Sequence, residues 1–350
     1  MSNMENLGKW ITNNTDKPFI ARRTINISGP VKSAKALVTG LGQFNFYIDG
    51  KKISDHVLDP GWTDYRKTIQ YVDFDVTEEL TAGAHTLEIE VGNGWFCWDQ
   101  DFGYSFHFPE FMPPNPNPYK AFSDYLICNM RLVVSFMDGS LDEIITDEAW
   151  QVKEHRVKHS NVYGSELIGA ECGDWQQAAL VDSQNIPAGK LTFQSQPAIK
   201  VIKTYQGKLI SEKDGIRIYD IGQNISGLLR TKVRGKAGEK LIFKPAEKLD
   251  ENGMPDQMAK NWMLIDTIIS YEIETDNQVE EVRQSFTYFA GRYFAVEGVA
   301  DILELNADAI TSAWKTDGSF NCDDDRYNRI YAMIEKTVEA NMLSVHTDCP

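Results

Sequence analysis

Over roughly its first 300 residues, this chain alternates short β-patterned runs with clusters of turn residues. Residues 36–39 and 44–48 are rich in β-branched or aromatic side chains, and residues 87–91 alternate apolar and polar side chains up to Gly92. A chain of many short strands with almost no helical periodicity is typical of a β-sandwich or jelly roll. The pattern therefore predicts a mainly β protein.

Two Asp-Gly pairs predict tight hairpins, because such turns need residues that tolerate positive φ. Asp49-Gly50 separates residues 47–48 from residues 51–53, and Asp138-Gly139 separates residues 132–136 from residues 141–145. Farther along, residues 228–233 and 240–243 are predicted strands joined across a Gly235 to Gly238 turn, and residues 293–297 form a late strand.

Proline and glycine between Pro187 and Pro197 indicate a domain boundary. We predict two antiparallel β-sandwich (jelly-roll-like) domains at residues 1–195 and 196–312, and a helical segment at residues 313–350. Residues 95–119 interrupt the first domain as an aromatic- and proline-rich loop, since proline cannot join a central ladder.

The helical segment contains one clear amphipathic helix, which begins near Asp323 or Asp324 as N-cap. Its apolar stripe consists of Tyr327, Ile330, Tyr331, Ile334 and Val338. Such a stripe needs a partner surface, so we expect the chain to be the front part of a longer protein, truncated as a helical domain starts. An exposed stripe is also expected to promote association, including a homodimer.

The net charge of −16 argues against a nucleic-acid partner, because a polyanion would be repelled. The N-terminus has no signal-peptide pattern, and no apolar run is long enough to span a membrane. Five widely spaced cysteines fit reduced thiols in a cytoplasmic protein better than disulfides or a zinc site. No cofactor or metal is predicted; carboxylates are abundant, but none has the spacing of a calcium loop.

Exposed tryptophans are candidate carbohydrate-binding residues, since an indole can lie against a sugar ring while carboxylates accept hydroxyl hydrogen bonds. The candidates are Trp62, Trp95, Trp98, Asp99 and Asp101. The alternative places Trp95 and Trp98 in the core or at a domain interface, and we favour it because large aromatics are mostly buried.

Other polar motifs have structural interpretations. Residues 219–227, with Gln223 and Asn224, could suit a sugar, but we favour turn chemistry, in which the Asn side chains satisfy local backbone groups. The acidic groups at residues 247–251 and 323–325 resemble a hairpin end and a helix cap. His155 and His159 are interpreted as a solvated pair. Nothing places two carboxylates across one sugar, as glycoside hydrolysis requires.

Asp348 is the exception among the acidic residues. It follows the helix and precedes Cys349-Pro350, where the proline disfavours helical geometry. A residue on a loop just after a helix is well placed to line a pocket.

Several phrases of the chain form a combination that is more specific than any one of them. They are Thr39-Gly40-Leu41-Gly42, Leu58-Asp59-Pro60-Gly61-Trp62-Thr63-Asp64-Tyr65, Gly92-Asn93-Gly94-Trp95-Phe96, Asp220-Ile221-Gly222-Gln223-Asn224-Ile225-Ser226-Gly227, Glu247-Lys248-Leu249, Phe286-Thr287-Tyr288-Phe289-Ala290-Gly291-Arg292-Tyr293, Ser319-Phe320-Asn321-Cys322 and Thr347-Asp348-Cys349-Pro350. In this order they resemble the bacterial α-L-rhamnosidases. One departure is Phe289-Ala290, where the family often has His-Gly.

The resemblance implies an inverting glycoside hydrolase that removes terminal α-L-rhamnose from glycosides or oligosaccharides. It also implies that the last helix begins an (α/α)6 catalytic barrel, and that Asp348 contacts the sugar. The family's general acid and base lie beyond the Asp-Cys-Pro phrase, so no catalytic residue is assigned within this chain, and the chain alone is expected to be inactive. Two alternatives stay open: an independent carbohydrate-binding module, and a scaffold that binds nothing.

Overall fold

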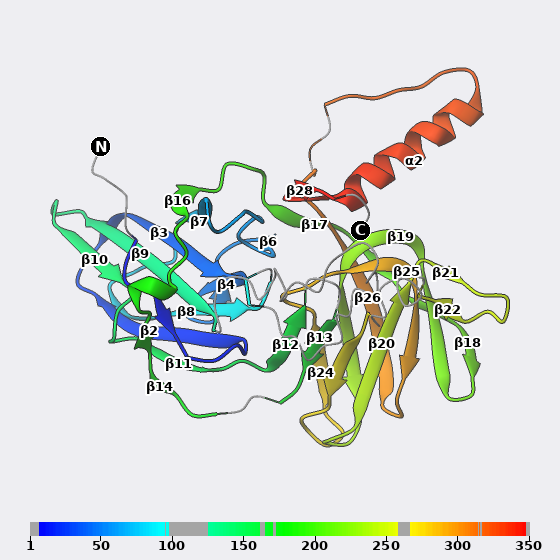
Figure 1. The fold of residues 1–350 in the computed structure, drawn as a ribbon, viewed down its shortest axis with the longest axis horizontal. Helices are drawn as coiled ribbons and strands as arrows, with labels where there is room; N and C mark the ends of the chain where they lie inside the picture. Colours follow the sequence, from blue (N-terminus) through cyan, green and yellow to red (C-terminus); the bar gives the residue numbers. More distant parts are fainter. Residues whose placement is uncertain are drawn as a thin grey trace. The chain divides into compact units, whose positions relative to one another are not determined.

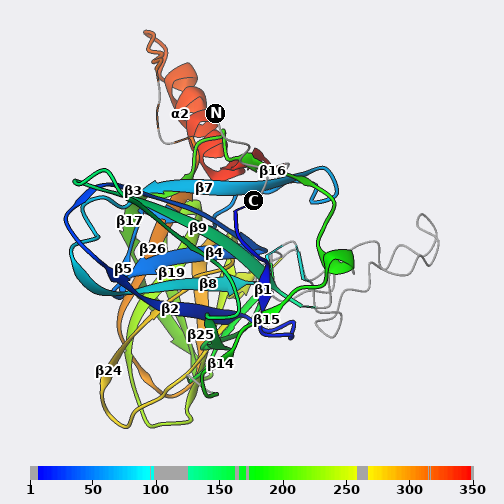
Figure 2. The ribbon, with the colours of Figure 1, turned by 90° about the vertical axis from the view of Figure 1, so that its left-hand side faces the viewer.

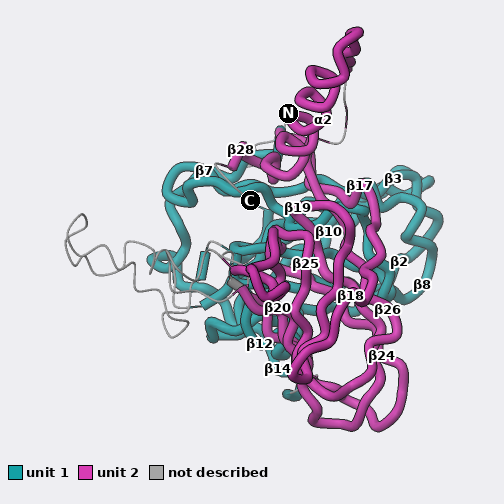
Figure 3. Tube along the Cα trace, turned by 90° about the vertical axis from the view of Figure 1, so that its right-hand side faces the viewer, with its two compact units in different colours: residues 1–103, 107–162, 171–195 teal, residues 104–106, 163–170, 196–350 magenta. Residues whose placement is uncertain are grey.

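The computed structural model of the chain describes residues 7–94, 96–97, 125–161, 165–170, 173–257, 267–313, 315 and 317–347. These residues fall into two compact units (Figure 3). Within the described ranges, unit 1 takes residues up to 161 and residues 173–195, and unit 2 takes residues 165–170 and residues from 196 onward. Strands dominate both units, and one α-helix follows them in the described chain, which confirms the predicted mainly β fold (Figure 1). The predicted domain boundaries stay a prediction.

Unit 1 is built from two sheets, whose layers Figure 2 shows. The first has the order β15-β1-β9-β3-β7-β16, with β10 also paired to β9, and the second has the order β14-β11-β2-β8-β4-β5. The strands of the first sheet are β1 (Ile11–Thr12), β3 (Val31–Leu41), β7 (Thr68–Asp75), β9 (Ile127–Phe136), β10 (Leu141–Ile145), β15 (Ala179–Leu180) and β16 (Lys190–Phe193). Those of the second are β2 (Phe19–Ile27), β4 (Gln43–Ile48), β5 (Lys51–Lys52), β8 (Gly83–Gly92), β11 (Gln151–Glu154) and β14 (Gln176–Gln177). Unit 1 also contains β6 (His56–Val57), β12 (Val157–Asn161) and the 3-10 helix η1 (Ser183–Asn185).

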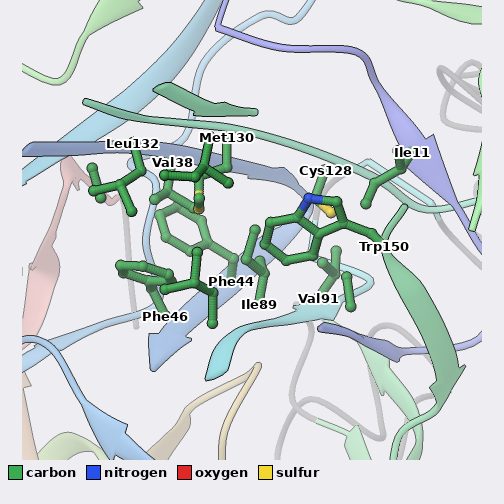
Figure 4. Packing of buried hydrophobic residues seen from close by; sticks show 14 of the residues in the cluster. Ile11, Val38, Phe44, Phe46, Ile89, Val91, Cys128, Met130, Leu132 and Trp150 are labelled. Atoms are coloured by element: carbon green, nitrogen blue, oxygen red, sulfur yellow. The ribbon is translucent and has the colours of Figure 1, made fainter. Parts of the chain in front are cut away.

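The core of unit 1 lies between these sheets (Figure 4). On β8, Leu87, Ile89 and Val91 are fully buried, whereas Glu88 and Glu90 point to the other face, as the period of a strand requires. Trp150 is also fully buried, and its indole Nε1 donates to the Ile145 carbonyl at 2.9 Å. The buried indole therefore leaves no unsatisfied donor.

Both predicted Asp-Gly hairpins are confirmed. Asp49 and Gly50 have φ values of 51° and 74° and connect β4 to β5, with Ile48 paired to Lys51. Gly139, with φ of 88°, lies in the turn between β9 and β10, where Leu141 pairs with Ser135.

Unit 2 is organised around one long strand, β19 (Ile216–Arg234). Its first half pairs with β18 and β25, and its second half pairs with β24 and β26, so this one strand takes part in four strand pairings of the sheet. The other strands of the unit are β13 (Ser165–Ile168), β17 (Ile199–Gln206), β18 (Lys208–Lys213), β20 (Lys240–Ala246), β21 (Lys248–Leu249), β22 (Pro255–Asp256), β23 (Ile269–Glu272), β24 (Val279–Arg283), β25 (Phe289–Glu297), β26 (Asp301–Thr311), β27 (Met342–Leu343) and β28 (Val345–His346).

The strands predicted at residues 228–233 and 240–243 exist as parts of β19 and β20, but they are not neighbours in the sheet. β25 lies between them and pairs with both. Most pairings are antiparallel, but β16 runs parallel to β7 and β13 runs parallel to β23. The predominantly antiparallel pairing agrees with the predicted fold class, and these two parallel pairs are additions to it.

The predicted helix is α2 (Asp325–Asn341), and its N-cap is Asp324, whose side chain accepts from the Arg326 backbone N–H at 2.9 Å. In unit 2, α2 projects from the sandwich and is joined to it at its C-terminal end (Figure 1). Four of the five stripe residues stay exposed, namely Tyr327, Ile330, Ile334 and Val338. Within the described residues, no helix is long and apolar enough to cross a membrane.

This exposed stripe should make the chain associate. Ile330 and Ile334 are 45% and 55% exposed, so a second molecule can bury them favourably. We expect light scattering to show a mass that rises with protein concentration, and the double variant Ile330→Lys, Ile334→Lys to stay monomeric. Ala332→Lys, on the same helix but outside the stripe, is the matched control and should associate like the parent. A parent that stays monomeric would contradict the prediction.

Candidate functional site

The segment that leads to Asp348 is fixed in place by hydrogen bonds at the end of α2. Asn341, which is 7% exposed, donates from Nδ2 to the Thr337 carbonyl at 2.9 Å. Thr347 returns to the same residue: its backbone N–H donates to the Asn341 carbonyl at 2.8 Å, and its hydroxyl lies 3.1 Å from Asn341 Oδ1. The chain closes this loop through the short β27–β28 pair, with Ser344 at φ of 64°.

Strands β19 and β26 of unit 2 anchor this loop. The Met342 carbonyl accepts from the Ser312 backbone N–H at 2.8 Å and from the Thr311 hydroxyl at 3.1 Å. The Ser226 hydroxyl, 2% exposed on β19, donates to the Ala340 carbonyl at 2.6 Å. These bonds satisfy carbonyls that a helix end leaves unpaired, so the sandwich fixes the backbone just before Asp348.

Most of the site residues predicted from the sequence lie outside the described residues: Asp348, Trp95, Trp98, Asp99 and Asp101. Trp62 is described and is 46% exposed. Because five of these six residues lie outside the described part of the chain, their roles stay predictions.

A β-bulge brings together several polar residues of the phrases at residues 220–227, 247–249 and 286–293. Arg292 on β25 donates to both carboxylate oxygens of Asp220 on β19, each at 2.8 Å, and the register shifts between Asp220 and Ile225. The Arg292 guanidinium lowers the pKa of Asp220 below its usual range. Asn224 Nδ2 donates to Glu247 at 2.8 Å. These contacts hold a β-bulge within the continuous strand β19, so the turn expected for this motif was wrong, although its polar residues do have structural partners.

The acidic groups at residues 247–251 and 323–325 also have structural roles. Asp250 Oδ1 accepts from the backbone N–H groups of Asn252 and Met254, both at 2.8 Å, in the β21–β22 turn. Asp324 caps α2. The predicted hairpin end and helix cap are confirmed at these two residues.

The interpretation of His155 and His159 as a solvated pair was wrong, because they are 5% and 6% exposed. His155 Nδ1 accepts from the Val157 backbone N–H at 2.9 Å, and its Nε2 lies 3.3 Å from Glu90 Oε1. Burial raises the pKa of Glu90, but hydrogen bonds from His155, Tyr47 and Asn45 lower that pKa by more than burial raises it. The net effect is a pKa below the usual range. Sequence spacing alone could not indicate that a carboxylate on β8 would face this imidazole.

The motif Gly92-Asn93-Gly94 forms a junction inside unit 1. Asn93, 2% exposed, donates from Nδ2 to the Asp16 carbonyl at 2.6 Å and accepts at Oδ1 from the Ser160 backbone N–H at 3.1 Å. Gly42, at φ of 108°, packs so closely that a Cβ on it would lie 2.0 Å from the Gly92 carbonyl oxygen. In the described part of the motif, the glycines therefore serve close packing.

No group of three potential metal ligands occurs among the described residues, and the cysteines found there (Cys97, Cys128 and Cys322) are free thiols. Burial raises the pKa of the Cys128 thiol. This thiol therefore stays protonated and unreactive at neutral pH.

Family models match almost the whole chain in consecutive order. They are an α-L-rhamnosidase N-terminal domain at residues 29–203, a bacterial α-L-rhamnosidase concanavalin-like domain at residues 210–314 and a bacterial α-L-rhamnosidase six-hairpin glycosidase domain at residues 315–350. β-domains followed by the start of a six-hairpin segment are the domain order that these three models describe. The chain belongs to the bacterial α-L-rhamnosidase family.

Known relatives agree with this assignment. An α-L-rhamnosidase of Formosa agariphila is 29% identical over 349 residues, which cover 94% of this chain and 35% of the relative. The structure of α-L-rhamnosidase from Dictyoglumus thermophilum matches with a TM-score of 0.84 and 26% identity, over 99% of this chain and 40% of that one. A Streptomyces avermitilis α-L-rhamnosidase complexed with L-rhamnose shares the fold, with a TM-score of 0.80 and 23% identity over 95% of this chain and 32% of that one. The chain thus spans little more than a third of the first two relatives.

Several residues of the Asp348 segment were missed by sequence reasoning. Asn341 and Ser312 do not stand out by spacing, and Ser226, although it belongs to the phrase at residues 220–227, gives no sign that it will bond to the Ala340 carbonyl. The available signal was Thr347, which belongs to the phrase Thr347-Asp348-Cys349-Pro350.

The structure also explains Phe289, where the family often has histidine: this ring is buried and packs against Phe294 with centroids 4.8 Å apart.

Proposed function

We propose that this chain is the N-terminal, non-catalytic part of an enzyme that hydrolyses terminal α-L-rhamnosyl linkages. The observation that carries the proposal is the consecutive match of three rhamnosidase domain models, which ends 36 residues into the glycosidase domain. The L-rhamnose complex of the Streptomyces relative supports rhamnose-containing glycosides as the substrate class.

In the proposed mechanism, one carboxylic acid protonates the leaving oxygen while a carboxylate activates water on the opposite face of the sugar. An inverting pair needs a separation of about 6.5–9.5 Å to admit that water. Both groups would come from sequence after Pro350. This chain would contribute Asp348 as a sugar contact, and the Asn341–Thr347 loop as the element that positions it.

The test compares the 350-residue chain with a longer version extended by the natural sequence that follows it. We expect the longer protein to hydrolyse an aryl α-L-rhamnoside and the 350-residue chain to give no turnover above a blank, because two-carboxylate catalysis needs both groups.

The extended protein with Asp348→Asn is the informative variant, and Asp317→Asn on the segment before α2 is its surface control. We expect Asp348→Asn to raise KM or lower kcat while Asp317→Asn leaves both unchanged. Turnover by the purified 350-residue chain, unaffected by further purification, would refute the assignment of the catalytic groups to the continuation.

A second candidate function is carbohydrate binding by the sandwich units themselves. The 46% exposure of Trp62 favours it, since an exposed indole can accept a sugar face. Titration of the chain with rhamnose should then change its tryptophan fluorescence, and Trp62→Ala should reduce that change. An unchanged spectrum up to millimolar rhamnose would favour a purely structural role.

A further inference from the structure

One strand of unit 2 comes from the stretch of sequence that otherwise builds unit 1. This strand is β13, because residues 165–170 belong to unit 2, whereas the described residues up to 161 and those from 173 to 195 belong to unit 1. β13 runs parallel to β23, and Glu166 pairs with Ile269. The concanavalin-like family model begins only at residue 210, so the sequence that it matches leaves this strand out.

A fully buried carboxylate fastens β13 to another part of unit 2. Glu166 is 0% exposed, and the backbone N–H of Ser285 donates to its Oε1 at 2.7 Å. The backbone N–H groups of Phe286 and Thr287 donate to its Oε2 at 2.9 and 3.1 Å. Successive backbone N–H groups that converge in this way form an anion-binding concavity. Its occupant here is a side chain of the same protein, which precedes the first donor by 119 residues. We call Glu166 together with residues 285–287 the clasp.

The two sides of the clasp depend on each other energetically. A buried carboxylate is costly unless hydrogen bonds compensate for the water that it loses. Phe286 and Thr287 are 0% and 1% exposed, so little water can reach this part of the backbone while the surrounding fold is intact. Withdrawal of Glu166 would therefore leave buried N–H groups without an acceptor, which costs more than the hydrogen bonds themselves contribute.

The clasp also reinforces a strand that is short. β13 has four residues, and its parallel pairing with β23 comprises three residue pairs. Parallel pairs are slightly less stable per residue than antiparallel pairs, whereas hydrogen bonds to a charged acceptor are stronger than those of a ladder. Residues 285–287 in turn connect β24 to β25, and both of these strands pair with β19. The clasp therefore links β13 to the connection between two strands of the sheet.

We propose that the clasp makes unit 2 depend on β13, so that β13, β23 and the connection between β24 and β25 open and close as one cooperative unit. The second β-domain is then not an autonomous module. A cut between residues 203 and 210, where the family models divide the chain, would remove β13 from its sheet and leave the N–H groups of residues 285–287 without their carboxylate. A first domain cut off at this boundary would likewise carry Glu166 without its donors.

The test is hydrogen exchange of the whole 350-residue chain, followed by mass spectrometry, for the parent and for Glu166→Gln. Glutamine keeps the shape of the side chain but has one acceptor oxygen and no charge. We expect exchange to become at least about tenfold faster at residues 285–287 and in β23, with β8 of unit 1 unchanged. Asp250→Asn is the matched control, since Asp250 also accepts from two backbone N–H groups but within its own exposed turn. Its effect should stay within the β21–β22 turn.

Three outcomes would overturn the proposal. Exchange that rises only at residues 285–287 would show that Glu166 merely satisfies a connection, and unchanged exchange in folded Glu166→Gln would show that the clasp adds nothing. A rise in β23 exchange of the same size in Asp250→Asn would show that unit 2 responds alike to the loss of any such carboxylate.

Should Glu166→Gln fail to fold, the unaltered chain still decides. Its amides in β13, in β23 and at residues 285–287 should converge on one free energy of opening as denaturant is added, as the members of one cooperative unit do. Separate free energies for β13 and for residues 285–287 would overturn the proposal. None of these measurements involves hydrolysis, and the inference does not rest on the rhamnosidase assignment.

Discussion

Replacing Asp308 with asparagine is expected to lower the free energy of unfolding of unit 2 by about 3 kcal/mol, because it breaks a buried charge pair. Asp308 lies on β26 with 4% of its side chain exposed. Arg230 on β19 donates to both of its oxygens at 3.0 Å, and the Thr204 hydroxyl donates at 2.6 Å. The carboxylate thus links β17, β26 and β19. The amide of an asparagine can accept only some of these three hydrogen bonds, because one of its two terminal atoms is a donor.

The loss should depend on pH. Burial raises the pKa of Asp308, but the hydrogen bonds from Arg230 and Thr204 lower it more, so its pKa in the folded state is below the unfolded value. A carboxylate whose pKa is lowered in the folded state contributes its full stabilisation when the pH is above the pKa of the unfolded chain, which is about 4. The contribution is lost as the pH falls through the pKa of the folded state. The difference between parent and Asp308→Asn should therefore be largest at neutral pH and shrink below about pH 4.

Chemical denaturation at pH 7 and at acidic pH would measure this difference. Glu304→Gln is the matched control, because Glu304 also lies on β26 and pairs with a cation of β19, Lys232, at 3.0 Å. That pair is exposed to solvent, so its loss should be much smaller. Equal effects of the two substitutions would show that burial of the Asp308 pair is unimportant.

Gly42→Ala is expected to destabilise unit 1 by about 3 kcal/mol or more, through backbone strain together with a steric clash. Gly42 has φ of 108°, and an added Cβ would lie 2.0 Å from the Gly92 carbonyl oxygen and 2.6 Å from that of Asn93. Neither oxygen can move easily, since residues 92–94 form the junction held by Asn93. Thermal unfolding followed by circular dichroism would measure the loss.

Gly50→Ala separates strain from clash. Gly50 also has positive φ, 74°, but no atom lies within 4 Å of the Cβ position. We expect a cost of only about 1 kcal/mol at this position, from the conformation alone. If both variants lost the same stability, the close approach at Gly42 would contribute nothing.

The local features of the fold were predictable because short sequences encode them. The Asp49-Gly50 and Asp138-Gly139 turns, the alternation on β8 and the Asp324 cap depend on residues that are neighbours in the chain. The pairing of β25 between β19 and β20 was not predictable in this way, because three strands of similar pattern allow several orders.

The candidate site divides in the same manner. The phrase around Asp348 and its order relative to the other phrases could be recognised from the sequence. The anchoring of the Ala340 and Met342 carbonyls by Ser226, Thr311 and Ser312 could not. Likewise, His155 gives no sign in the sequence that it will be buried beside Glu90, 65 positions earlier.

The sequence by itself determined the mainly β class, the turns, the final helix and the family resemblance, since these depend on local propensity and on the order of short motifs. Only the tertiary structure decided which charges pair, as Asp308 does with Arg230, and which glycines pack against backbone atoms, as Gly42 does against Gly92. The physical reason is that hydrogen bonds and ion pairs act over a few ångströms in space, and folding brings together residues whose separation in the chain is unconstrained.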